Sequence, residues 1–213
     1  MADAGTHAAL MDATYRHQRL IYDATRRYFL LGRDHLIADL APDPGARILE
    51  VACGTGRNLA RISRRYPDAR LFGLDISREM LRSADAKLGS RAELRQGDAC
   101  TFDPDGLFGV AGFDRIVLSY GISMIPDWHG AMAHAARCLA PGGSLHVVDF
   151  GQQDGLPRWF AGALVSWLAR FHVERRPDLE DVAKDVARGI GGRALYESLY
   201  RDYARYAVIA RPA

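Results

Sequence analysis

Residues 50–56 read Glu50-Val51-Ala52-Cys53-Gly54-Thr55-Gly56, and this stretch decides the fold. It closes a short apolar run, 46–51, whose bounding turn signals predict a strand buried on both faces of a parallel sheet. A segment with helical spacing, 58–66, follows at once. Glycines in a strand-to-helix turn tolerate positive φ and let the backbone approach a ligand closely, because no Cβ intervenes. The stretch therefore predicts a ligand-binding loop at the carboxyl end of the first strand.

Strand and helix patterns alternate along the rest of the chain. Apolar runs between turn signals predict strands, and segments with helical spacing predict the helices that separate them. Repeated alternation of this kind is typical of a parallel sheet covered on both faces. The further strands are expected at 70–75, 92–96, 114–119, 144–149, 194–200 and 203–210, and the further helices at 78–88, 127–139, 156–171 and a segment ending near 188.

The two ends of the chain depart from this alternation. Only Arg201 and Asp202 separate the last two strands, which is the spacing of a hairpin between antiparallel neighbours. The fold class is therefore α/β: a doubly wound, seven-stranded, mostly parallel sheet with an antiparallel C-terminal hairpin. Apolar residues at helical spacing over 7–40 predict one or two helices before the core. We expect residues 1–44 to form a helical lid on a single core domain, residues 45–213.

A carboxylate at the end of the second strand narrows the choice of ligand. Asp75 lies 19 residues beyond Gly56, where an acidic side chain can accept hydrogen bonds from both hydroxyls of a ribose. NAD and S-adenosylmethionine both carry such a ribose. The loop departs from the dinucleotide pattern, because Leu59 stands where the third glycine should allow close packing around a pyrophosphate. Hydride transfer is therefore the less favoured of the two alternatives.

Composition limits the partners and the compartment. The formal net charge is only +2, and the 28 basic residues are spread along the sequence, so no nucleic-acid partner is expected. The three cysteines are far apart, which suits a reducing cytoplasm. No stretch approaches the roughly 20 apolar residues that span a bilayer. The chain is expected to be cytoplasmic, either free or peripheral at the inner face of the membrane.

No metal site is expected. His129 and His134 are five residues apart, which does not place both on one helical face at the usual ligand spacing, and the cysteines show no paired spacing suited to zinc.

These motifs resemble those of the class I S-adenosylmethionine-dependent methyltransferases, and the likeness covers roughly residues 46–149. It implies that Glu50 orders the loop near the methionine amino group, that Asp75 binds the ribose and that Ser119-Tyr120 lies nearest the methyl group. Leu139-Ala140-Pro141-Gly142-Gly143 resembles the turn before the family's fifth strand. The remaining cofactor contacts that the resemblance implies are Ala52, Cys53, Gly54, Thr55, Gly56, Asn58, Ile76, Met80, Asp98, Ala99 and Cys100.

The flanking segments are similar to the betaine-lipid N-methyltransferases. The likeness lies in Tyr15-Arg16-His17-Gln18, in residues 21–28 and 31–34, in Trp159, and in the C-terminal segments 170–173, 176–179 and 203–206. It implies successive N-methylation of the homoserine amine of diacylglyceryl-homoserine, which gives a trimethylated lipid head group. Methyl transfer is an in-line displacement, so an oriented neutral amine needs no covalent enzyme nucleophile.

Aromatic faces stabilise the cation that forms as methyl groups accumulate. The candidate cage is Tyr15, Tyr22, Tyr28 and Tyr120, with Tyr22 also expected beside the cofactor. Arg33 is a candidate partner for a carboxylate of the cofactor or substrate. For each tyrosine, ordinary helix packing is the alternative. The same choice applies to His17 and His146, which are either general bases or packing residues.

Three questions stay open in the sequence. The acceptor could be another lipid amine, such as that of phosphatidylethanolamine, or a small metabolite. The chain could instead be a cofactor-binding regulatory subunit without activity. The aromatic segment 159–171 could contact a bilayer, although covering the sheet is favoured, and the sequence gives no oligomeric state.

Overall fold

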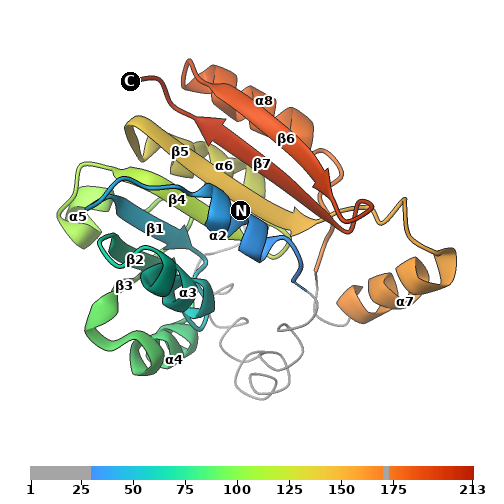
Figure 1. The fold of residues 1–213 in the computed structure, drawn as a ribbon, viewed down its shortest axis with the longest axis horizontal. Helices are drawn as coiled ribbons and strands as arrows, with labels where there is room; N and C mark the ends of the chain where they lie inside the picture. The colour runs from blue at the N-terminus through green and yellow to red at the C-terminus, as the bar shows by residue number, and fades with distance from the viewer. Residues whose placement is uncertain (1–29, 170–172) are drawn as a thin grey trace.

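A computed structural model describes residues 30–169 and 173–213, and its centre is a seven-stranded sheet (Figure 1). The strand order is β3-β2-β1-β4-β5-β7-β6. β7 pairs antiparallel with both β5 and β6, while every other pairing is parallel. The expected α/β class and antiparallel hairpin are confirmed. The strands are β1 Arg47–Val51, β2 Arg70–Asp75, β3 Glu93–Gln96, β4 Phe113–Ser119, β5 Leu139–Phe150, β6 Arg193–Leu199 and β7 Ala204–Ala210.

Helices cover both faces of the sheet, as expected for a doubly wound fold. One apolar cluster joins the sheet to α5, α6 and α8, and a second joins it to α2, α3 and α4. The helices are α2 Arg33–Asp39, α3 Arg57–Arg65, α4 Arg78–Leu88, α5 Pro104–Phe108, α6 Trp128–Arg137, α7 Arg158–Ala169 and α8 Leu179–Gly189, with a short 3₁₀ turn, η1, at Gly89–Arg91.

The strand order reverses at β1, which places a switch point between β1 and β4. In the register, Val51 pairs with Leu74 on one side and with Leu118 on the other, so three strands end at the same level. Because ligands in open α/β sheets bind outside the carboxyl ends of strands at such a point, the residues that follow these ends are the first place to look for a site.

Side-chain caps mark the starts of α4 and α6. The Ser77 hydroxyl accepts a hydrogen bond from the backbone N–H of Met80 at 3.3 Å, and the Asp127 carboxylate accepts one from Gly130 at 2.9 Å. Each bond satisfies a donor that the first turn of a helix leaves unpaired. α4 and α6 accordingly begin where the sequence predicts.

Three details differ from the expectation. Residues 139–143, expected as a turn, form an irregularity inside β5. Phe113 of β4 pairs with Leu139, whereas Arg115 pairs with Ser144. The hairpin loop contains four residues, 200–203, instead of two, and its residues 200, 201 and 202 all have positive φ. The short helix α5 has no counterpart in the predicted pattern, because five residues cannot display a helical period.

The segment ahead of β1 packs on the sheet where it is described. Leu36, Ile37 and Leu40 of α2 are buried in the same cluster as Ile48 of β1. Residues 1–29, which carry most of the expected lid, lie outside the described residues. Within the described ranges, no helix is long and apolar enough to cross a membrane.

Candidate cofactor site

The loop after β1 has the backbone that its sequence predicts. Ala52, Gly54 and Gly56 all have positive φ, at 55°, 54° and 69°. A Cβ on Gly54 would meet nothing within 4 Å, whereas one on Gly56 would approach the Leu88 side chain to 2.7 Å. The two glycines therefore have different structural roles. Gly54 leaves space beside the loop, and Gly56 lets α3 pack against α4.

Asp75 ties the end of β2 to this loop. Its carboxylate accepts one hydrogen bond from the backbone N–H of Gly54 at 2.8 Å and another from that of Ser77 at 2.9 Å. The side chain is buried. The carboxylate therefore holds the glycine loop against the end of β2.

Glu50 ends the buried part of β1 with its carboxylate inside the protein. One oxygen, Oε1, accepts a hydrogen bond from the side-chain amide of Asn58 at 2.7 Å. Burial raises the pKa of Glu50 to about 8, against the lowering effects of Asn58, of the Leu59 backbone and of Arg33. A cation placed beside this carboxyl would favour its ionised form, since opposite charge lowers the pKa of an acid.

A small polar cavity joins these residues to the start of α2. Three buried side-chain atoms in its wall lack a hydrogen-bond partner among the described residues: Oε2 of Glu50, Oδ1 of Asn58 and Oγ of Ser119. Its volume is about 40 Å³, so one small polar group fits it in this conformation. The wall consists of Leu30, Arg33, Glu50, Ala52, Cys53, Gly54, Thr55, Arg57, Asn58 and Ser119.

Arg33 brings a buried cation to this cavity. Its Nε donates a hydrogen bond to the carbonyl oxygen of Leu30 at 3.0 Å. The guanidinium is close enough to Glu50 to lower the pKa of that carboxyl. The expectation that Arg33 reaches the site is consistent with this position, and the unpaired Glu50 oxygen next to it calls for a donor.

The residues expected beside an adenine lie along the adjoining edge. Ile76 and Met80 follow β2, and the Ile76 carbonyl accepts a hydrogen bond from the Gln96 amide at 2.9 Å. After β3, Oδ1 of Asp98 accepts one from the backbone N–H of Cys100 at 2.8 Å, and Ala99 lies between them. Burial raises the pKa of the Cys100 thiol to about 11, so the thiol is neutral near pH 7.

Tyr120, expected in an aromatic cage, is not among the residues that line this cavity. It is buried, with its ring against Phe150 at a centroid distance of 4.6 Å. Its hydroxyl donates a hydrogen bond to the carbonyl oxygen of Leu31. These contacts give Tyr120 a packing role: they connect the residue after β4 to the segment just before α2. Tyr15, Tyr22, Tyr28 and His17 lie outside the described residues.

His146 has the packing role that the sequence left as an alternative. It lies within β5, and its ring nitrogens contact the hydroxyls of Ser144 at 2.9 Å and Tyr206 at 2.6 Å. Burial lowers its pKa to about 4. The ring is therefore neutral near pH 7 and is held in the sheet, away from the strand ends.

Sequence reasoning missed a polar group at the end of β5. The buried Asp149 carboxylate accepts a hydrogen bond from the backbone N–H of Ser123 at 3.0 Å. Oγ of the same Ser123, and Nε2 of Gln152 three residues after Asp149, are buried without a partner among the described residues. The available signal was the one that found Asp75: a carboxylate at the carboxyl end of a buried parallel strand.

Within residues 30–169 and 173–213, no group of three His, Cys, Asp or Glu side chains is placed to hold a metal ion.

Comparison with known proteins now adds to this geometry. Residues 48–143 match a family model described as a methyltransferase domain. The chain is 34% identical over 127 residues to a ubiquinone/menaquinone biosynthesis C-methyltransferase of Cereibacter sphaeroides, covering 57% of this chain and 49% of that protein. It is 31% identical over 150 residues to the nocamycin O-methyltransferase of Saccharothrix syringae, covering 68% and 52%. The match thus spans about half the length of these relatives.

A solved structure extends the likeness to the whole fold. The plantazolicin methyltransferase BpumL, in complex with a substrate analogue and S-adenosylhomocysteine (SAH), superposes with a TM-score of 0.70 at 16% identity, covering 99% of this chain and 97% of that one. The matched domain, together with a loop and acidic strand end of the expected geometry, supports S-adenosylmethionine as the cofactor. Residues 48–143 thus resemble a methyltransferase domain in sequence, and the described residues have the fold of the class I S-adenosylmethionine-dependent methyltransferases.

Proposed function

We propose that this protein transfers a methyl group from S-adenosylmethionine to the amine of a lipid head group, namely the homoserine amine of diacylglyceryl-homoserine. The observation that carries the methyl-transfer part is the polar cavity at the switch point. There, beside the glycine loop, Glu50 and Asn58 each keep a buried oxygen that has no partner among the described residues. Buried polar atoms are normally paired, so these call for a ligand that brings donors.

The residues present fit the cofactor group by group. The unpaired Glu50 oxygen would accept from the ammonium of the methionine part, and Arg33 would pair with its carboxylate. Asp75, at the end of β2 beside the loop, would accept hydrogen bonds from the ribose hydroxyls. The edge formed by Ile76, Met80, Asp98, Ala99 and Cys100 would contact the adenine. The bound cofactor supplies a methyl group made electrophilic by its sulfonium.

The acceptor is the finer part of the proposal. Support for an amine comes from the flanking sequence motifs, whereas the relatives named above are a C- and an O-methyltransferase. An amine acceptor needs orientation and loss of its proton. Ser119, whose buried hydroxyl has no described partner, is the polar group that we assign to orient it. In this proposal Tyr15, Tyr22 and Tyr28 supply the aromatic faces from the N-terminal lid.

The acceptor assay is direct. Purified protein, labelled S-adenosylmethionine and diacylglyceryl-homoserine should give mono-, di- and trimethylated lipid. Phosphatidylethanolamine, a hydroxyl acceptor and a quinol acceptor are run in parallel. Transfer to one of these others, with none to the homoserine lipid, would reject the lipid-amine proposal and keep methyl transfer.

The second candidate, a cofactor-binding subunit without activity, is separated by the same experiment. A chain that binds S-adenosylhomocysteine but transfers no methyl to any component of a total lipid or metabolite extract fits the subunit. Contact with a membrane, if the acceptor is a lipid, is assigned to α7. Trp159 of this helix is 76% exposed, while Leu164 and Leu168 pack into the core.

A further inference from the structure

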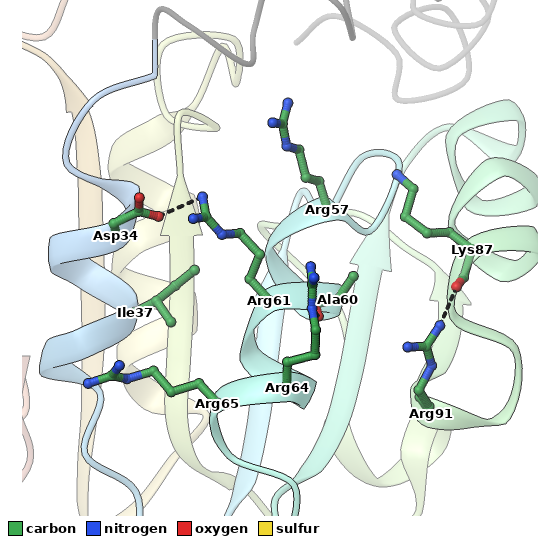
Figure 2. A pocket seen from close by; sticks show the side chains of 9 residues that line it. All are labelled: Asp34, Ile37, Arg57, Ala60, Arg61, Arg64, Arg65, Lys87 and Arg91. Atoms are coloured by element: carbon green, nitrogen blue, oxygen red, sulfur yellow. Dashed lines mark hydrogen bonds and ion pairs between the residues drawn. The ribbon is translucent and has the colours of Figure 1, made fainter.

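A second and much larger depression lies beside the cofactor cavity, over α3 and the end of α4 (Figure 2). Its volume is about 1010 Å³. Six of its lining side chains are basic and one, Asp34, is acidic. The basic residues are Arg57, Arg61, Arg64, Arg65, Lys87 and Arg91, and we call this surface the basic depression.

Helical spacing and packing together create the basic depression. Arg57, Arg61 and Arg64 are four and three residues apart on α3, so they share one face of that helix. Lys87 is in the last turn of α4, and Arg91 ends the 3₁₀ turn that follows. The packing of α3 against α4, which Gly56 permits, brings the two groups of cations around one hollow.

Three of these cations, Arg64, Arg65 and Arg91, form no ion pair with a described residue. Arg61 pairs with Asp34 at 2.6 Å. Arg64 donates a hydrogen bond to the Ala60 carbonyl at 2.9 Å and Arg91 to that of Leu88 at 3.0 Å, while Lys87 donates one to that of Thr55 at 2.6 Å. A carbonyl orients a guanidinium without neutralising it. A hollow lined by one sign of charge concentrates ions of the opposite sign.

We propose that the basic depression binds a phosphate group, carried either by a soluble phosphomonoester or by an anionic lipid head group. Guanidinium groups donate paired, charge-assisted hydrogen bonds to phosphate oxygens, and several of them converge here. Arg57 lines both the basic depression and the cofactor cavity. A phosphate held there therefore lies next to the cofactor. Binding needs no methyl acceptor, so it can be tested apart from the proposed reaction.

Two pairs of variants with equal change in net charge test the site. R64E/R91E alters the basic depression without touching the cofactor cavity, and R188E/R193E alters exposed arginines of α8 and β6. Calorimetry with inorganic phosphate and with glycerol 3-phosphate measures the soluble source. Co-sedimentation with phosphatidylcholine vesicles, with and without phosphatidylglycerol, measures the lipid source. Thermal melting and S-adenosylhomocysteine binding check the fold of each variant.

The wild-type protein should bind at least one phosphate source saturably, and R64E/R91E should bind it about tenfold more weakly or worse, while R188E/R193E stays close to wild type. Binding should also weaken as salt is raised from about 20 to 300 mM, because screening shortens the reach of exposed charges. If R64E/R91E does not fold, R64Q/R91Q replaces it with the same expected direction. Equal losses in both pairs, or no binding by the wild type to any probe, would overturn the proposal.

Discussion

The carboxylate of Asp75 accepts a hydrogen bond from the backbone N–H of Gly54 at 2.8 Å, across 21 residues of chain. The bond fixes the glycine loop after β1 to the end of β2, the strand beside it. Asp75 therefore shapes the loop before any cofactor binds. Loss of this side chain should affect the loop and the cofactor together.

Asp75→Ala should weaken S-adenosylhomocysteine binding by about ten- to a hundredfold, since a hydrogen bond to a charged group contributes roughly 1.5–3 kcal/mol. Isothermal titration calorimetry measures the affinity. Asp85→Ala, which removes an exposed carboxylate on α4, is the matched control and should bind like the wild type. Equal affinity in the two variants would remove the ribose assignment.

Glu50 should couple cofactor binding to proton release. Its pKa is raised to about 8 by burial, so the carboxyl is largely protonated near pH 7. An ammonium placed beside it favours the ionised form and lowers this pKa. Affinity for S-adenosylhomocysteine should therefore rise as the pH increases from about 6 to 8, with protons released to the buffer. Calorimetry in two buffers of different ionisation enthalpy counts these protons.

The matched variant is Glu50→Gln, which keeps the size of the side chain and removes its titration. It should bind more weakly and release no protons over the same range. Proton release that persists unchanged in Glu50→Gln would mean that another group titrates on binding.

Substitutions at the two glycines of the loop should affect protein stability and cofactor affinity to different extents. Gly54→Ala and Gly56→Ala both place a Cβ at positive φ, which costs about 1–2 kcal/mol. Only at Gly56 does the new methyl collide with protein, at 2.7 Å from Leu88 and 3.0 Å from Ala84. Gly56→Ala should therefore lose more stability in urea unfolding, and Gly54→Ala should lose more cofactor affinity at equal folded fraction. The reverse ranking would contradict the roles given to the two residues.

His146 should make the protein less stable in mild acid. Its pKa in the folded protein is lowered to about 4, while an imidazole in the unfolded chain titrates near 6.5. Between these two pKa values, His146 is protonated in the unfolded chain but neutral in the folded protein. The stabilising contribution of neutral His146 to the free energy of unfolding is thus complete above about pH 6.5. It falls as the pH is lowered toward about 4, by roughly 3 kcal/mol in total.

Urea unfolding at several pH values measures this slope. His146→Gln, which keeps a donor and an acceptor for Ser144 and Tyr206, should have a flatter profile over the same range. His129→Gln removes an exposed imidazole and serves as the control. Identical slopes for wild type and His146→Gln would show that His146 is not the group responsible.

The sequence by itself determined the sheet and the loop, because those signals are local. Period-two and period-3.6 patterns place strands and helices, and caps such as Ser77 and Asp127 mark where helices begin. Glu50, Gly54 and Asp75 could be assigned together because parallel strands in this fold end at one edge. None of these predictions depends on how a helix packs on the sheet.

Tertiary structure alone decided which distant side chains meet. Tyr120 follows the expected strand, yet packing against Phe150 and a bond to Leu31 remove it from the cavity. The arginines of α3 are close together in the sequence, but only the packing of α3 on α4 brings Lys87 and Arg91 to the same depression. These contacts depend on the position at which each helix packs on the sheet. The hydrophobic periodicity of one helix or strand carries no information about the side chains of its neighbour.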